Sequence, residues 1–305
     1  MFKSLLTAAL ALTSLTSTLA APAPVMEKRA HEMNITDINI LNYALTLEHL
    51  EANFYATGLA NFSADAFTSA GYPSYIRDNI AEIGRQEAQH VSFLSTALGA
   101  AAVEACTYQF PVTDVPSFLA VAQVLEGVGV SAYLGAAKDI QVKDYLTAAG
   151  SILTVEARHS AWLRSAVGGL SPFPAAEDTP LDYDEVYTLA SAFITACPST
   201  NSQLPPDLMA FPALAASPAS GVKPNDTITL TTDANPDGEV VYAAFISALS
   251  TVWSEISPSG QVKVPAALAP GQVYVVLTKN GTSVADEDIV AGPAIVDVLV
   301  DYIKY

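Results

Sequence analysis

Apolar residues recur every three or four positions in long stretches of the first two thirds of the chain. This period is typical of amphipathic helices, and it predicts four of them in succession. A shorter stretch with the same period predicts a fifth helix, which would end at Cys197 and Pro198. The expected helices cover about 36–58, 74–98, a segment beginning just after Pro116, 142–167 and 183–196.

After residue 221 the apolar positions alternate with polar ones, which is the period of β-strands. Short runs rich in Val, Ile and Thr are separated by turn sequences such as Pro236-Asp-Gly238 and Asn280-Gly281. We therefore expect a mainly α chain with a β tail: a four-helix bundle plus a fifth helix over 30–198, a linker over 199–220, and a small immunoglobulin-like β-sandwich over 221–305 as an accessory module.

Six residues with ligand chemistry interrupt the apolar stripes of the four long helices instead of lying on their polar faces. Two of the helices contain the motif Glu-x-x-His, which places a carboxylate and an imidazole one turn apart. Burying a carboxylate costs several kcal/mol, so four buried glutamates without a cation would consume most of the stability of a domain. The pattern predicts a site for two metal ions, with the ligands Glu48, Glu87, His90, Glu126, Glu156 and His159.

Two tyrosines repeat a second spacing, because Tyr55 follows Glu48 by seven residues and Tyr133 follows Glu126 by seven. Tyrosines at such positions are commonly core residues, and the alternative is that each hydroxyl bonds a ligating carboxylate. In the first helix Glu51 is a rival ligand on a second apolar stripe. Glu48 is preferred because its spacing of seven residues from Tyr55 recurs between Glu126 and Tyr133. Glu51 is then expected to lie beside the ligands.

The ordered pattern of Glu48, Glu87-x-x-His90, Glu126 and Glu156-x-x-His159 resembles the ferritin-like superfamily of ferritins, bacterioferritins and rubrerythrins. The segment Leu45-Thr-Leu-Glu-His-Leu-Glu-Ala-Asn-Phe-Tyr55 is similar to a ferritin-like group that includes desiccation-related plant proteins. Secreted stress-response and late-sexual-development proteins of filamentous fungi belong to the same group. The resemblance covers about 35–215 and implies a di-iron or di-manganese bundle. The β-rich tail departs from the cage ferritins and speaks against a closed storage shell.

The resemblance implies oxidoreductase chemistry of the ferroxidase or oxidase type, or peroxide detoxification, linked to stress or development. Its partners would be two metal ions and oxygen or peroxide. Carboxylate and imidazole ligands without a thiolate favour iron first and manganese second, and leave zinc open. The alternative is a non-catalytic stress or cell-wall protein that keeps the metal site for stability, with the sandwich contacting a cell-wall or protein partner.

The N-terminus predicts export. Lys3, a short apolar core and a small-residue cleavage site ending at Ala20 indicate a signal peptide over 1–20, and the apolar core is too short for a membrane anchor. Lys28-Arg29 forms a dibasic processing site that would remove 21–29 as a propeptide, unless these are only two charges on a flexible leader. No later segment is expected to span a bilayer.

The charge and cysteine content of the chain fit an exported protein. The chain has 13 basic and 31 acidic residues, and loss of 1–29 removes three basic and one acidic, leaving 10 and 30. This balance argues against nucleic acid and anionic membranes as partners. Cys106 and Cys197 are expected to form one disulfide. The N-glycosylation sequons are at Asn34, Asn61, Asn225 and Asn280, so we expect a secreted glycoprotein, either extracellular or in the cell wall.

Overall fold

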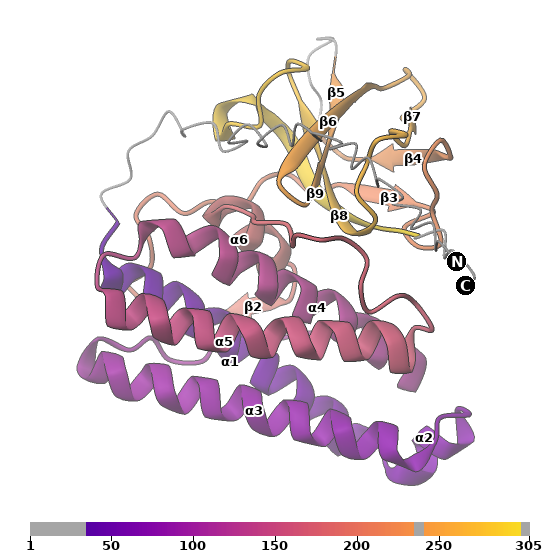
Figure 1. Ribbon diagram of the computed structural model, residues 1–305. Coiled ribbons are helices and arrows are strands. Elements are labelled where there is room, and N and C mark those ends of the chain that lie inside the picture. Colours follow the sequence, from indigo (N-terminus) through magenta and orange to yellow (C-terminus); the bar gives the residue numbers. More distant parts are fainter. Residues whose placement is uncertain (1–34, 235–240, 300–305) are drawn as a thin grey trace, which may run out of the picture.

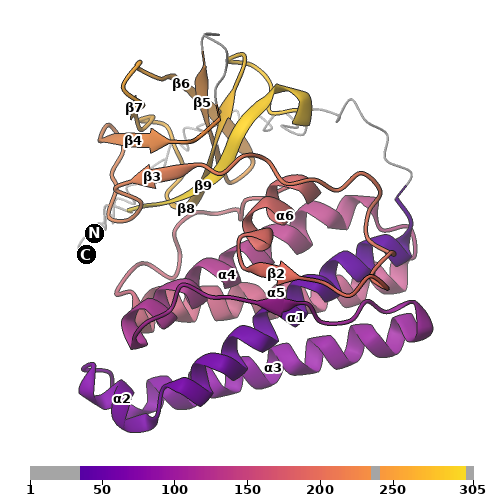
Figure 2. The same ribbon diagram turned by 180° about the vertical axis from the view of Figure 1, so that it is seen from behind.

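The computed structural model describes residues 35–234 and 241–299. The expected signal peptide, the expected propeptide and the sequon at Asn34 lie outside these ranges and stay predictions. The described chain has a helical part below a β-rich part (Figure 1). Figure 2 shows the same two layers from behind.

Four long helices form the bundle, and side-chain caps mark where two of them begin. The first long helix packs along the second, and the third along the fourth. The first helix begins after a capping box in which the side chains of Thr36 and Asn39 bond each other's backbone. Asp114 and Ser117 cap the third helix in the same way. The helices are α1 (Asp37–Asn61), α3 (Ser74–Leu98), α4 (Val115–Ala136) and α5 (Lys143–Trp162), with the short α2 (Ala64–Ser69) between α1 and α3 and a π turn (Leu163–Val167) extending α5.

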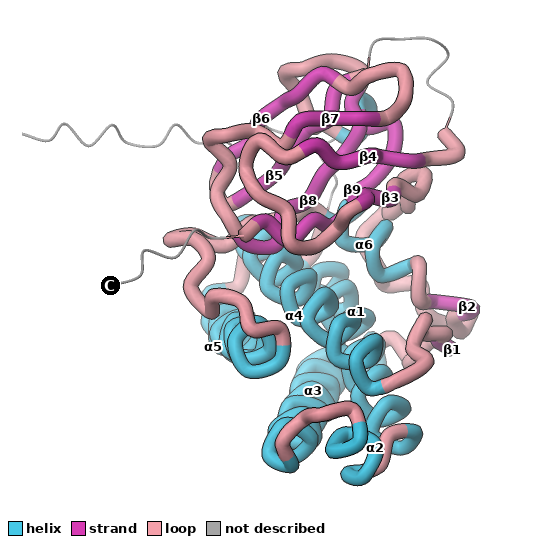
Figure 3. Tube along the Cα trace, turned by 90° about the vertical axis from the view of Figure 1, so that its right-hand side faces the viewer, coloured by secondary structure: helices cyan, strands magenta, loops and turns pink. Residues whose placement is uncertain are grey.

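Helix α4 bears on the expectation that no segment after the signal peptide spans a bilayer. With its last turn, Val115–Asp139 is long and apolar enough to cross a membrane by length and composition alone, and it is mostly buried inside the protein. Its apolar residues lie on several sides because α4 is central, in contact with α1, α5 and α6 (Tyr183–Ser191). Figure 3 shows α4 between α1 and α5, directly beneath the β-rich part. An all-round apolar surface is what a central core helix requires.

The fifth helix is shorter than predicted. It ends at Ser191, and the following residues form β2 (Ile194–Ala196), which pairs antiparallel with β1 (Thr107–Tyr108). The helical period continues past Ser191, but pairing with a distant segment overrides it. Cys197 then meets Cys106 in a disulfide, with the two Cα atoms 4.2 Å apart. The predicted disulfide is present.

Loss of this disulfide should destabilise the protein. The bond joins positions 91 residues apart, and in the chain-entropy model such a loop contributes about 4–5 kcal/mol. The Cys106→Ala/Cys197→Ala variant should therefore unfold at a clearly lower urea concentration than the parent. Titration of the parent protein, denatured without reductant, should detect no free thiols. Two free thiols in that experiment would contradict the bond.

The β-rich part consists of two antiparallel sheets that share one hydrophobic core. Ile228 and Val262 of one sheet pack with Phe245, Val273 and Val275 of the other. A three-stranded sheet has the order β3 (Ala215–Ser217), β4 (Thr227–Thr231), β7 (Gln261–Lys263), and a four-stranded sheet has the order β6 (Ser250–Glu255), β5 (Tyr242–Ser247), β8 (Gly271–Thr278), β9 (Ile289–Val298).

Two of these strands were not predicted. Strand β3 lies in the expected linker, whose Phe211 is also buried against the bundle. Strand β6 follows β5 after a two-residue turn, Ala248-Leu249, which contains no glycine and places Ala248 at a φ of 50°. The sequence signal of a tight hairpin is therefore missing there.

The sandwich packs directly on the bundle. Ile246 and Val276 belong to the same hydrophobic core as the helices. The hydroxyl of Tyr274 donates to the carbonyl oxygen of Gly127 in α4, at 3.0 Å. Beside it, the buried guanidinium of Arg164 lies 2.5 Å from Asp297 Oδ1 in β9. These contacts make the sandwich part of the structure that holds α4 in place.

Candidate metal centre

The bundle core contains a cluster of ionisable side chains drawn from all four long helices. Helix α1 supplies Glu48, α3 supplies the first Glu-x-x-His pair, α4 supplies Glu126 and α5 supplies the second pair. The four carboxylates have no solvent exposure at all, and His159 and His90 are 5% and 9% exposed. All six residues predicted as ligands therefore lie in the interior, at the places where they interrupt the apolar stripes.

These side chains form two overlapping ligand groups. In each group, one ligand atom from every residue lies within 4.8 Å of the others. A cation with ligands at about 2.0–2.2 Å brings opposite ligand atoms to roughly 4.4 Å, so each group is close to the size of one ion site. The first group is Glu48, Glu87, His90 and Glu156, and the second is Glu87, Glu126, Glu156 and His159.

Glu87 and Glu156 belong to both groups, which is the position of carboxylates that bridge two ions. The remaining members divide evenly, one glutamate and one histidine at each end. Nδ1 of His90 lies 3.0 Å from Glu87 Oε2 and 3.4 Å from Glu156 Oε1. On the other side, Nδ1 of His159 lies 2.9 Å from Glu87 Oε1. Both imidazoles thus present the same nitrogen to the shared carboxylates.

The two tyrosines connect the halves of the site. The hydroxyl of Tyr55 in α1 donates to Glu126 Oε1 of α4, at 2.5 Å. Reciprocally, the hydroxyl of Tyr133 in α4 donates to Glu48 Oε1 of α1. Each tyrosine therefore bonds the glutamate of the opposite helix, not its own, because α1 and α4 run antiparallel past each other. Such bonds fix the direction in which a ligating carboxylate points.

The carboxylates leave acceptor capacity for cations. Oε2 of Glu156 is buried without a hydrogen-bond partner among the described residues, while Oε1 of Glu156 and Oε1 of Glu87 each face an imidazole nitrogen, at 3.4 Å and 2.9 Å. A buried, unsatisfied carboxylate oxygen is costly, and a divalent cation is the partner that satisfies it. The chemistry of this donor set, mixed carboxylate and imidazole without thiolate, suits iron or manganese. The residues present therefore fit a two-metal centre.

Protons take the place of cations in the metal-free protein. Burial raises the pKa of Glu48 to about 7, and burial together with the neighbouring Glu87 raises the pKa of Glu156 well above its usual value. Burial alone would lower the pKa of His90 and His159. Hydrogen bonds with the surrounding glutamates outweigh it and raise these pKa values to about 12 and about 9. Metal binding must displace such protons.

Glu51, the rival ligand, lies next to the centre but in neither group. It is 4% exposed. A Cβ atom added at Gly129 of α4 would lie 2.7 Å from Glu156 Oε2 and 3.2 Å from Glu51 Oε1, so both carboxylates face the same point above that glycine. The structure thus places Glu48 among the candidate ligands and Glu51 beside them.

Gln86 contacts the site and was not identified from the sequence. Its Oε1 lies 2.8 Å from Nε2 of His159, and its amide nitrogen donates to Glu82 Oε1 at 3.1 Å. This arrangement turns Nδ1 of His159 toward the carboxylates, as expected for a ligating histidine whose other nitrogen bonds a carbonyl. Gln86 adjoins Glu87 in sequence but faces another helix, so no periodic pattern marks it.

Replacing Gln86 should weaken metal binding without abolishing it. The Gln86→Leu variant removes the acceptor that orients His159, and outer partners of this kind typically change metal affinity by about 10–100-fold. Competition with a chromophoric chelator would measure the change for Mn(II). Gln203→Leu, at an exposed position outside the four long helices, is the control. Equal affinity of Gln86→Leu and parent would show that Gln86 does not position the imidazole.

Comparison with known proteins agrees with this geometry. Residues 36–169 match the family model described as a ferritin-like domain. The chain is therefore similar to this family over its four long helices. The expected helical region followed by an antiparallel β region is confirmed.

The sequence that follows this match also has a counterpart in a known protein. The chain is similar to Protein rds1 of Schizosaccharomyces pombe (strain 972 / ATCC 24843), with 29% identity over 260 residues. The match covers 83% of this chain and 62% of that relative, so the chain spans less than two thirds of the relative's length.

Proposed function

We propose that this protein is a secreted ferritin-like protein that binds two metal ions, iron or manganese, and uses them in oxidation chemistry. The observation that carries the proposal is the sharing of Glu87 and Glu156 by two buried ligand groups. Bound iron would supply one-electron redox chemistry with oxygen or peroxide. A link to stress or development follows from the resemblance in the sequence.

The chain's own residues would set the conditions for this chemistry. The tyrosine hydroxyls hold Glu48 and Glu126 in place, and Gln86 orients His159. The apolar stripes around the ligands exclude bulk water, which strengthens electrostatic interactions in the site.

Secretion and glycosylation are part of the proposal and have partial support. The Cys106–Cys197 disulfide is typical of an oxidising compartment. Two of the sequons, at Asn61 and Asn225, are exposed and so accessible to a glycan. Contact of the sandwich with a cell-wall or protein partner also stays a proposal.

Oxygen uptake on addition of Fe(II) tests the proposed activity. The parent should consume oxygen at least tenfold faster than Fe(II) in buffer. The Glu87→Gln variant should match buffer, and Glu177→Gln, at an exposed position outside the bundle, should match the parent. A parent that binds two ions but takes up no more oxygen than Glu87→Gln would favour the alternative of a stabilising, non-catalytic metal site.

A further inference from the structure

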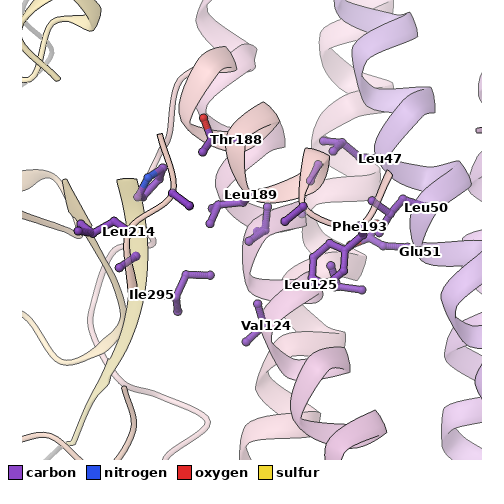
Figure 4. A pocket seen from close by; sticks show the side chains of 17 residues that line it. Leu47, Leu50, Glu51, Val124, Leu125, Thr188, Leu189, Phe193, Leu214 and Ile295 are labelled. Atoms are coloured by element: carbon purple, nitrogen blue, oxygen red, sulfur yellow. The ribbon is translucent and has the colours of Figure 1, made fainter. Parts of the chain in front are cut away.

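A cavity of about 280 Å³ lies between the bundle and the sandwich. It is bounded by α1, α4, α6 with the residues after it, and β9. Figure 4 shows Leu50 and Glu51 at one end, Leu214 and Ile295 at the other, and Leu125 and Leu189 between them. Its lining is almost entirely apolar, so it favours a ligand of the same character.

Glu51 is the one charged side chain among the residues that line this cavity. It is 96% buried, since only 4% of the residue is exposed, and no hydrogen bond to it is found within the described chain. The second polar residue of the lining, Thr188, is already satisfied: its hydroxyl donates to the carbonyl of Asp184 and accepts from the backbone of Phe211. Glu51 therefore presents an unused acceptor to an apolar space.

The cavity adjoins the metal centre through Gly129. Gly129 lines the cavity, and a Cβ atom at this position would lie only 2.7 Å from Glu156 Oε2. The absence of a side chain there brings the cavity close to one of the two shared carboxylates. A molecule in the cavity would thus sit beside Glu51 and next to the ligand cluster.

We propose that this cavity binds a small apolar molecule that carries a hydroxyl or amino group, with Glu51 as the acceptor of its hydrogen bond. A cavity of about 150 Å³ holds benzene, so the present volume accommodates a molecule of about two fused rings. Glu51 lies beside the buried Glu156, so neighbouring carboxylates repel an anionic head group, whereas a hydroxyl or amino group supplies a donor for the unused acceptor of Glu51.

Binding of 2-naphthol to the full chain, measured by isothermal titration calorimetry, tests the proposal, with naphthalene as the ligand that lacks the donor. We expect one 2-naphthol per parent chain. Leu189→Trp and Val124→Phe place larger side chains in the cavity from two of its walls. Each should lower the affinity of the protein for 2-naphthol at least tenfold. Glu51→Leu should lower the affinity for 2-naphthol by about tenfold, the equivalent of one hydrogen bond, and leave that for naphthalene unchanged.

The controls separate this site from surface adsorption and from the metal centre. Phe93→Trp places the same indole on an exposed face of α3 and should bind 2-naphthol like the parent. Glu51→Leu should still bind two metal ions. No binding by the parent, or equal affinity in all the variants, would overturn the proposal. If Glu51→Leu lowered the affinities for 2-naphthol and for naphthalene by the same factor, the role of Glu51 as hydrogen-bond acceptor would be overturned.

Discussion

The Glu87→Gln variant should lose stoichiometric binding of two metal ions and should no longer be stabilised by Mn(II) or Fe(II). Glu87 belongs to both ligand groups, so a neutral amide removes one anionic ligand from each. Binding to the folded state alone stabilises a protein by about 2.7 kcal/mol per site when the ligand is at 100 times its Kd. The parent should show this gain in a thermal melt with metal, and the variant should not.

The change from Glu to Gln conserves volume, so it leaves no cavity that could explain the loss. Glu177→Gln carries the same substitution at an exposed position and should keep both metals and the stabilisation. Glu156→Gln, at the other shared carboxylate, should behave like Glu87→Gln. Tight binding of two ions by the Glu87→Gln protein would mean that these residues are not the ligands.

Replacing Arg164 by Met should destabilise the protein by about 3–5 kcal/mol, because it leaves Asp297 buried without its charge partner. Arg164 also donates to the carbonyl oxygen of Ser171 at 3.0 Å. Among the residues that the structure describes, Oδ2 of Asp297 has no hydrogen-bond partner, so within this part of the chain Arg164 is the partner on which the carboxylate depends. Urea unfolding of the full chain would measure the loss.

The double variant Arg164→Met/Asp297→Leu should recover much of this stability, since removing both charges removes the unpaired one. Arg85→Met is the matched control: Arg85 pairs with Glu82 at 2.5 Å, but both side chains are half exposed, so the loss of stability should be much smaller than for Arg164→Met. Equal, small effects of Arg164→Met and Arg85→Met would show that the contact between bundle and sandwich contributes little.

The helices and the members of the cluster could be predicted because both depend on local periodicity. Glu48 and Glu126 each interrupt an apolar stripe, and that signal lies within one helix. The partner of each tyrosine could not be predicted in this way. Tyr55 bonds Glu126 and not Glu48, because the pairing depends on the antiparallel register of α1 and α4.

The features that the sequence did not predict depend on contacts between distant segments. Strand β2 exists because it pairs with β1, and this pairing shortens the fifth helix. Gln86 lies off the apolar stripe of α3 and meets His159 only when α3 and α5 pack. One local signal was present: Gly129 lies inside a helix, where glycine costs about 1 kcal/mol, and such a residue commonly marks a close approach. Here it leaves room for Glu156.

Anomalous diffraction from crystals of the purified full chain, recorded at the iron and manganese absorption edges, tests the central claim most directly. The account predicts two peaks about 3.5–4 Å apart, both in contact with Glu87 and Glu156. One peak should also lie next to His90 and the other next to His159. Crystals of metal-supplemented protein with no peak among these carboxylates would contradict the two-metal centre.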